Sequence, residues 1–159
     1  MAYYEEHPVF YNPENIHATI WRYMSFSKFI SILDKNALYF SVANKLEDKW
    51  EGTLPYKNKE NMEESIISFF EQARASNAIN CWHMREVESA SMWKSYVNDS
   101  DGIAIKSSFS RLTECFKEIE AITTYKLPLH VGVVKYINFE KEVKSAVDFV
   151  ERFCDLLDP

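Results

Sequence analysis

Apolar side chains recur along much of the chain with the spacing of helices. Residues 26, 29, 30 and 33 are all apolar, so the pattern predicts a helix over about residues 26–35. Ser25 or Ser27 can cap its start, and Asn36 suits its C-terminal end. Similar patterns predict further helices over about residues 60–76, 89–98 and 139–157, and one capped by Ser107 or Ser108 with Phe109, Leu112, Phe116 and Ile119 turned inward.

Runs of β-branched and aromatic residues predict the strands. The strongest of these signals covers residues 129–137. Residues 43–60 are polar, and we expect them to be irregular, while the polar cluster at 98–102 is typical of a turn. The remaining predicted strands cover residues 19–24, 37–42, 78–83 and 103–106.

The predicted helices and strands alternate along the chain, and such alternation usually indicates an α/β fold with a parallel sheet. Several connections contain loops rather than compact crossovers, so we expect an α+β fold, with α/β as the alternative. The predicted domain is single, with a mixed central sheet of about five strands and flanking helices. The first 18 residues are polar and interrupted by Pro8 and Pro13, and we interpret residues 1–18 as an N-terminal arm that leads into a domain over 19–159.

Composition narrows the classes of function. The chain has 159 residues, of which 47% are hydrophobic and 26% charged, which is typical of a globular domain. Three isolated glycines exclude the glycine-rich turns that hold dinucleotides or phosphates. A net charge of -6 gives no support for nucleic acid as a partner. No apolar run reaches the roughly 18 residues of a membrane span, so no membrane partner is expected.

The three cysteines lie far apart and form no metal-binding pair. We interpret them as buried thiols in a reducing compartment, which favours a cytoplasmic protein.

Arg22 is the most informative polar residue. It lies between Trp21 and Tyr23 in a predicted strand, and an arginine there is costly to bury unless it meets an anion or a carboxylate. One interpretation is an edge-strand arginine paired with an acidic residue. The other is an anion clamp, because a guanidinium matches a phosphate in a bidentate way.

Two further groups of residues could carry chemistry. Asp48 and Glu51 in a polar loop could supply a general base or hold a divalent cation, or they could simply be solvated. Cys81 and His83, two apart on a predicted strand, point to the same face and could pair a thiol with an imidazole, although neighbouring residues of this kind more often enter separate pockets.

The predicted helix over 89–98 carries Trp93 and Tyr96. Aromatic residues at this spacing usually belong to a core. They could also form a stacking wall for a flat ligand ring.

Several motifs, in their order and spacing, resemble the bacterial and phage family catalogued as domain of unknown function 2971. The resemblance covers about residues 19–137. The motifs are Trp21-Arg22-Tyr23-Met24, Leu38-Tyr-Phe-Ser41, Glu47-Asp48-Lys49-Trp50-Glu51-Gly52, Asn80-Cys-Trp-His83, Ser91-Met-Trp-Lys-Ser-Tyr96, Asp101-Gly-Ile-Ala-Ile105 and Val133-Val-Lys-Tyr136. Lys49 stands where the family usually has proline, and family members usually continue beyond the equivalent of Pro159 with a strand resembling His-Glu-x-Glu.

The resemblance implies a site like that of ADP-ribosyltransferases. Arg22 and Ser41 would then bind a nucleotide, with NAD as a candidate cofactor, and Tyr96 or Trp93 would stack on a ring. The catalytic glutamate would lie beyond residue 159, so the chain would bind its ligand but catalyse poorly.

These observations lead to three hypotheses. The first is an incomplete member of this family that binds a nucleotide-like small molecule, with ligand contacts from Arg22, Tyr23, Ser41, Trp93 and Tyr96. The second is a non-enzymatic, defence- or toxin-associated module that binds a protein partner. The third is a metal-dependent hydrolase or nuclease with Asp48, Glu51 and His83 as catalytic residues.

Overall fold

The chain was analysed as a computed structural model with two compact units. The structure describes residues 2–3, 10–46, 63–97, 101–120, 128–134 and 136. The first unit comprises Met1–Glu6, Phe10–Tyr39 and Cys81–Val133, and the second comprises His7–Val9, Phe40–Asn80 and Val134–Pro159.

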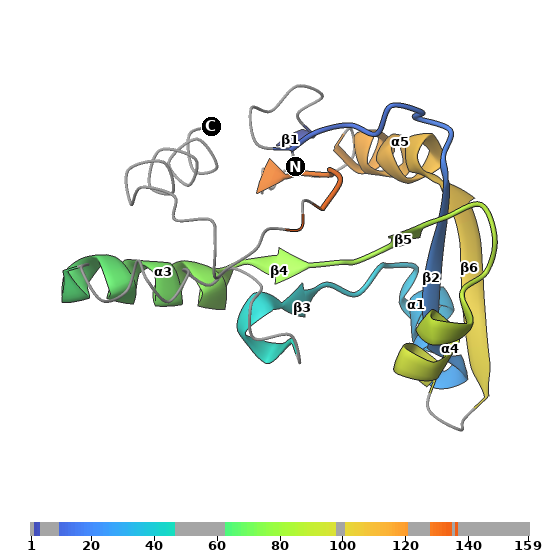
Figure 1. The fold of residues 1–159 in the computed structure, drawn as a ribbon, viewed down its shortest axis with the longest axis horizontal. Helices are drawn as coiled ribbons and strands as arrows, with labels where there is room; N and C mark the ends of the chain where they lie inside the picture. The colour runs from blue at the N-terminus through green and yellow to red at the C-terminus, as the bar shows by residue number, and fades with distance from the viewer. Residues whose placement is uncertain are drawn as a thin grey trace. The chain divides into compact units, whose positions relative to one another are not determined.

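The first unit is built on a three-stranded antiparallel sheet with the order β5-β2-β6. Figure 1 shows the two long strands, β2 (Thr19–Ser25) and β6 (Gly102–Ser108), side by side. All seven residues of β2 pair with β6, whereas β5 (His83–Met84) pairs with only Ile20 and Trp21. Aromatic and β-branched residues suit the pleated, half-buried surface of β2, and the prediction of this strand is confirmed.

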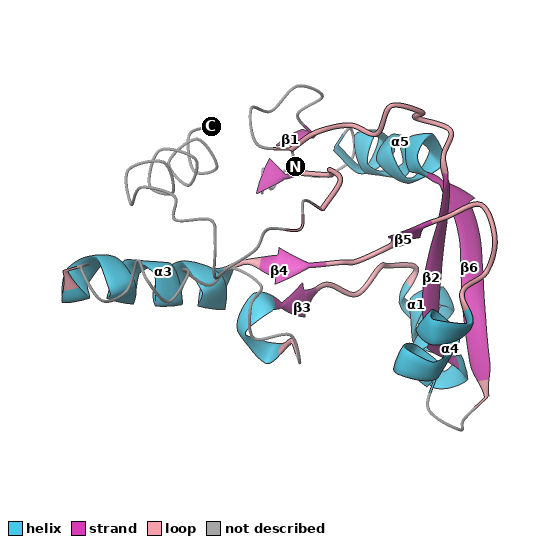
Figure 2. Cartoon of the chain, viewed as in Figure 1, coloured by secondary structure: helices cyan, strands magenta, loops and turns pink. Residues whose placement is uncertain are grey.

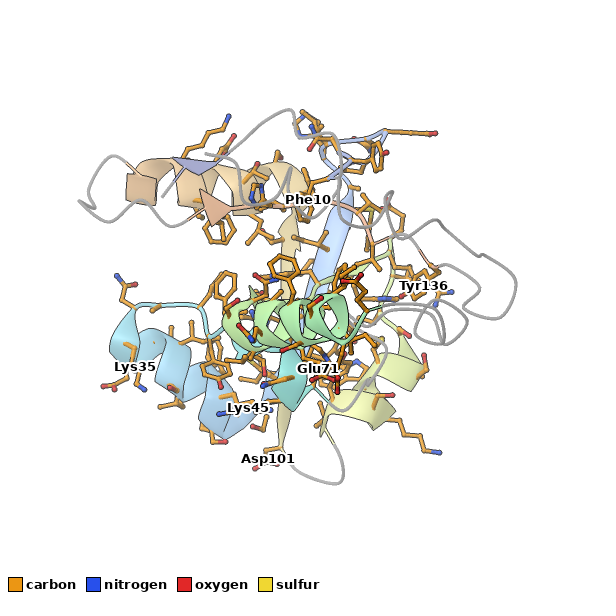
Figure 3. All side chains as sticks on the ribbon, turned by 90° about the vertical axis from the view of Figure 1, so that its left-hand side faces the viewer. Phe10, Lys35, Lys45, Glu71, Asp101 and Tyr136 are labelled. Atoms are coloured by element: carbon orange, nitrogen blue, oxygen red, sulfur yellow. The ribbon has the colours of Figure 1, made fainter. Side chains whose placement is uncertain are left out.

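Helix α1 (Phe26–Lys35) follows β2 directly and has the bounds that the apolar spacing predicts. Asn36 ends it in the left-handed conformation, with φ of 47°, and its backbone N–H donates to the carbonyl of Ile32. Ser25 occupies the N-cap position without making the capping hydrogen bond. The backbone carbonyl of Asp101, which is labelled in Figure 3 just before β6, accepts a hydrogen bond of 2.9 Å from the backbone N–H of Phe26.

Helix α5 (Phe109–Glu120) continues from β6 and contributes much of the core. The side chains of Phe109, Leu112 and Phe116 are buried, as the helical spacing predicts. Ser108 caps the helix through its hydroxyl, which accepts the backbone N–H of Arg111 at 3.3 Å. Together with Ile20, Trp21, Tyr23 and Met24 of β2, these residues form the buried centre of the first unit.

Helix α4 (Ala90–Val97) packs against β2 and β6, and Gly102 allows its close approach (Figure 2). A Cβ atom at Gly102 would overlap the methyl groups of Val97 and would lie 3.0 Å from the ring of Trp93. A side chain at this position therefore has to displace the side chains of Val97 and Trp93.

Gly102→Ala is expected to lower the free energy of unfolding by about 1–3 kcal/mol, the usual range for overpacking a core. The measurement is urea unfolding of wild type and variant. Ser31→Ala on the exposed surface of α1 is the matched control and should change stability by about 0.5 kcal/mol or less. Equal stability of wild type and Gly102→Ala would show that α4 does not pack this closely.

The second unit contains a two-stranded antiparallel pair and one long helix. Strand β3 (Ser41–Val42) pairs with β4 (Ala78–Ile79), and η1 (Ala43–Lys45) follows β3. Helix α3 (Glu64–Ser76) lies within the range predicted from apolar spacing and buries Phe70. The carbonyl of Asn77, just after α3, accepts the backbone N–H of Ala43 at 2.9 Å, which ties the helix end to η1.

The described fold is α+β, but the prediction of a single mixed sheet of about five strands is wrong. The structure has the three-stranded antiparallel sheet and separate two-stranded pairs, β3-β4 and the parallel pair β1 (Ala2–Tyr3) with β7 (Pro128–Leu129). The physical reason lies in residues 78–83, which were expected to form one strand. They are divided between β4 and β5, and these two strands pair with different partners.

Two other strand predictions are too long. Of residues 37–42, only Ser41–Val42 form a strand. Of residues 129–137, Leu129 ends β7, and 130–134 are not in a strand; residues 130–133 contact Phe10 and Tyr11 instead. There the backbone N–H of Val133 donates to the carbonyl of Tyr11 at 2.9 Å, and a Cβ at Gly132 would lie 3.0 Å from Phe10. The expected turn at 98–102 is described only in part, and the expected helix over 139–157 lies outside the described residues.

Candidate functional site

The alternation of β2 separates its residues onto two faces of the sheet. Arg22 is in register with Ile105 of β6, so these two side chains share one face. Trp21 is in register with Lys106 on β6 and with His83 on β5, so these three share the opposite face. The sequence candidates Arg22 and His83 therefore belong to opposite faces of the same sheet.

The guanidinium of Arg22 is held by residues on both sides of the strand. Its Nη2 donates a hydrogen bond of 3.0 Å to the backbone carbonyl of Tyr39, which follows α1. The guanidinium carbon lies 5.9 Å from the centre of the Trp82 ring, within the range of a cation–π interaction. One further step along the β2-β5 register puts Trp82 opposite Arg22, which explains this contact.

The other terminal nitrogen of Arg22, Nη1, is removed from solvent. Nη1 is buried, and it has no hydrogen-bond partner among the residues that the structure describes. Burial lowers the pKa of Arg22, because desolvation disfavours the charged form, while Cys81 and Tyr96 act in the opposite direction. A buried donor of a charged group without an acceptor is energetically unfavourable, and an anion would relieve this cost.

Tyr23 is buried on the other face of the sheet, where it contacts Trp93 of α4. The Tyr23 hydroxyl accepts the backbone N–H of Ser89 at 2.9 Å, and the Tyr23 and Trp93 rings meet edge to face with 5.0 Å between their centres. Trp93 Nε1 also donates to the carboxylate of Glu88 at 2.9 Å. The contacts with Tyr23 hold α4 against β2. No residue of α4 is buried, so the interpretation of Trp93 and Tyr96 as core residues is not confirmed.

The remaining sequence candidates that the structure describes are divided between the two units. Ser41 is in β3 of the second unit, whereas Arg22 is in the first. His83 is half-buried, and its Nε2 has no hydrogen-bond partner within the described ranges. Tyr96 is on α4, with 53% of its surface exposed.

The acidic loop predicted to carry catalytic residues includes Asp48 and Glu51. Asp48 and Glu51 lie outside the described residues, so their predicted catalytic roles stay predictions. Within the described ranges, no three histidine, cysteine, aspartate or glutamate side chains are grouped in a way that could hold a metal ion.

Sequence reasoning did not select Tyr39 and Trp82 as site residues, although both are part of the motifs quoted above. Tyr39 contributes a backbone carbonyl, and no side-chain pattern reveals such a role. Trp82 could have been found from the antiparallel register of residues 78–83 with the strand that carries Arg22, but the pairing itself was unknown.

The first unit thus combines helices with a three-stranded antiparallel sheet, and a partly buried arginine lies at the middle of the central strand of that sheet. None of the helices in the described part of the chain has the length and apolar character needed to cross a membrane. Comparisons with protein-family models, with curated proteins and with solved structures find no match for this chain. The function is therefore argued from the chemistry of the site.

Proposed function

We propose that the first unit binds a nucleotide-like ligand, that is, an anionic group attached to a flat ring, at Arg22. The observation that carries this proposal is the buried Nη1 of Arg22, which has no acceptor among the described residues. Proteins rarely retain a buried, unsatisfied charged donor, and functional sites are where such an arrangement is kept.

The surroundings of Arg22 support the same class of ligand. The bond from Nη2 to the Tyr39 carbonyl fixes one side of the planar guanidinium and leaves Nη1 for an oxyanion, so little side-chain entropy is lost on binding. Trp82 places an aromatic ring near the charge, with 5.9 Å between the guanidinium carbon and the ring centre. Aromatic faces of this kind stack on nucleobases with a gain of about 1–3 kcal/mol per base in single-stranded nucleic-acid complexes.

The proposal concerns binding. The resemblance adds NAD as a ligand to test and Ser41 as a further contact, and both stay predictions. In this proposal, Arg22 orients the anion, while Tyr23 and Trp93 hold α4 in place behind the sheet.

The test is calorimetric titration of the full chain with AMP, NAD and ADP-ribose. We expect one of these ligands to bind wild type, and we expect Arg22→Gln to weaken it by about 10- to 150-fold, the equivalent of the 1.5–3 kcal/mol of a hydrogen bond to a charged group. Arg111→Gln, on the exposed surface of α5, is the matched control and should leave the affinity unchanged.

Two results would contradict the proposal. One is the absence of binding by wild type for every ligand in the series. The other is equal affinity of wild type and Arg22→Gln. If, in addition, a stoichiometric protein partner were captured from the native host, the protein-interaction hypothesis would be favoured instead.

A further inference from the structure

A histidine and a serine from distant parts of the first unit meet at the start of α5. Ser110 is the second residue of this helix, and its Oγ lies 3.2 Å from Nδ1 of His17. A nucleophile and its general base make a hydrogen bond of this length. His17 is exposed and Ser110 is half-buried, so a substrate can reach the pair. The proposed function uses neither residue.

The backbone holds His17 beside Ser110. The carbonyl of Ile16, just before His17, accepts the N–H of Ser110 at 2.8 Å. The carbonyl of Ala18, just after His17, accepts the N–H of Phe109 at 3.1 Å. Two hydrogen bonds therefore fix the segment that carries the imidazole, one on each side of it. A catalytic pair needs this kind of support from rigid neighbours.

The protons of the cluster can be placed from its hydrogen bonds. Ser108 Oγ accepts the backbone N–H of Arg111 at 3.3 Å and lies 3.1 Å from Ser110 Oγ. With Arg111 as its donor, Ser108 gives its single proton to Ser110, and Ser110 gives its own proton to His17 Nδ1. In the reverse direction the Ser108 proton would have no acceptor in this chain of bonds. The order therefore directs the Ser110 proton at the imidazole and strengthens the bond between them.

The start of α5 favours a nucleophile at this position rather than a bound anion. The backbone N–H groups of Phe109, Ser110 and Arg111 already donate to the neighbouring segment and to Ser108. They are engaged, so they do not hold a ligand. The helix dipole still stabilises negative charge in the first turn, where the Ser110 oxygen becomes negative as it loses its proton.

We infer that Ser110 is a nucleophile that accepts the acyl group of activated carboxylic esters, with His17 as its general base. Ser110 Oγ attacks the ester carbonyl carbon while its proton passes to Nδ1 of His17. The bond to the leaving oxygen breaks, its electron pair leaves with that oxygen, and the imidazolium returns the proton to it. The product is an acyl-serine and an alcohol.

Water completes the cycle through the same imidazole. It attacks the acyl carbon and gives a proton to His17, which passes it to the Ser110 oxygen as the carboxylic acid leaves. The engaged N–H groups of α5 give no help to the oxyanion of either step. The substrate class is therefore esters with a good leaving group, such as aryl esters.

The experiment uses 4-nitrophenyl acetate as the probe. The full chain is mixed with the ester and quenched in acid at successive times, and tandem mass spectrometry of the digested protein locates the acetyl groups. We expect Ser110 to be acetylated, and 4-nitrophenol to be released, faster than the exposed Ser31 of α1 is modified. No acetyl group on Ser110, or acetylation no faster than at Ser31, would overturn the inference. This comparison within the wild-type chain depends on no variant.

Variants separate general-base catalysis from a structural hydrogen bond. His17→Asn keeps a hydrogen-bonding group near Ser110 but removes the base, and it should slow acetylation of Ser110 by about 100-fold or more. Ser110→Ala should remove the acetyl group from this segment, and Ser31→Ala is the matched control and should leave the rate at Ser110 unchanged. Melting curves establish that each variant is folded. A folded His17→Asn variant acetylated at the wild-type rate would overturn the role of His17.

Discussion

Arg22→Met is expected to raise the free energy of unfolding of the ligand-free protein by about 1 kcal/mol while it removes binding of the anionic ligand. Methionine has a similar length and fills the space along the strand without a charge. Replacing a buried ion pair by apolar residues of similar volume is often neutral or stabilising by about 1–4 kcal/mol. We expect the lower end of this range for Arg22, because it is a single charge that is only partly buried.

Arg22→Met has two opposing effects on the free energy of unfolding. The substitution removes a charged donor at Nη1 that burial leaves unsatisfied within the described structure. It also removes the bond to the carbonyl of Tyr39, with a net loss of about 0.5–1.5 kcal/mol. Tyr39 is 70% exposed, so water can replace the lost donor. The relief of desolvation is therefore expected to exceed the loss.

Urea unfolding at one temperature measures this prediction. Arg111→Met, at an exposed position of α5, is the matched control and should change the free energy of unfolding by about 0.5 kcal/mol or less. A loss of stability in Arg22→Met by about 1 kcal/mol or more would instead support the interpretation of Arg22 as a structural arginine. This test requires no knowledge of the ligand.

Trp21→Ala is expected to lower the free energy of unfolding by about 3–5 kcal/mol, the usual cost of removing a large aromatic side chain from a core. Trp21 is 8% exposed and lies in the central strand, where its ring is roughly parallel to that of Tyr23. Its Nε1 donates a hydrogen bond of 2.8 Å to the carbonyl of Arg85, and Lys106 lies over its ring. The substitution would leave a cavity between β2 and the residues that cover it.

Thermal unfolding measures this effect as a fall in melting temperature of about 6–20 °C, from about 2–4 °C per kcal/mol for a chain of this size. Trp21→Phe separates the ring from its hydrogen bond, and we expect it to cost less than Trp21→Ala. A fall of less than about 3 °C for Trp21→Ala would be inconsistent with a buried position in the central strand.

Local structure was predictable where neighbouring residues decide it. The bounds of α1 follow from the spacing of Phe26, Phe29, Ile30 and Leu33, and its end follows from Asn36, which tolerates the left-handed conformation. The cap at Ser108 and the inward face of α5 follow in the same way from residues within two turns. These features need no information about the rest of the chain.

The sheet could not be predicted, because pairing joins residues that are far apart in sequence. Residues 78–83 have the composition of one strand, and nothing within them indicates that Ala78–Ile79 pair with Ser41–Val42 while His83 pairs with Trp21. The prediction of a single five-stranded sheet failed at this point. The pairing of β5 with β2 also places Trp82 next to Arg22, so the cation–π contact between them could not be predicted from the sequence.

Arg22 could be selected as a candidate residue from the sequence, but the groups that contact it could not. Arg22 was selected because a charged residue in an aromatic strand needs a partner, and the structure places its Nη1 in a buried position. Strand alternation alone places its neighbour Tyr23 on the opposite face, so a ligand at Arg22 is not expected to touch Tyr23. The contribution of the Tyr39 carbonyl depends on where the chain runs after α1, which only the fold defines.

The central claim is that Arg22 binds the anion, and its side-chain NMR signal tests this most directly. The ¹⁵N-labelled chain is titrated with the adenosine ligand that binds most tightly, and the arginine Nε–H signals are followed, with Arg22 assigned from the Arg22→Gln variant. We predict that the Arg22 signal shifts saturably with ligand while that of Arg111 stays constant. An Arg22 signal that remains unchanged at saturation, or a shift confined to another arginine, would contradict the claim.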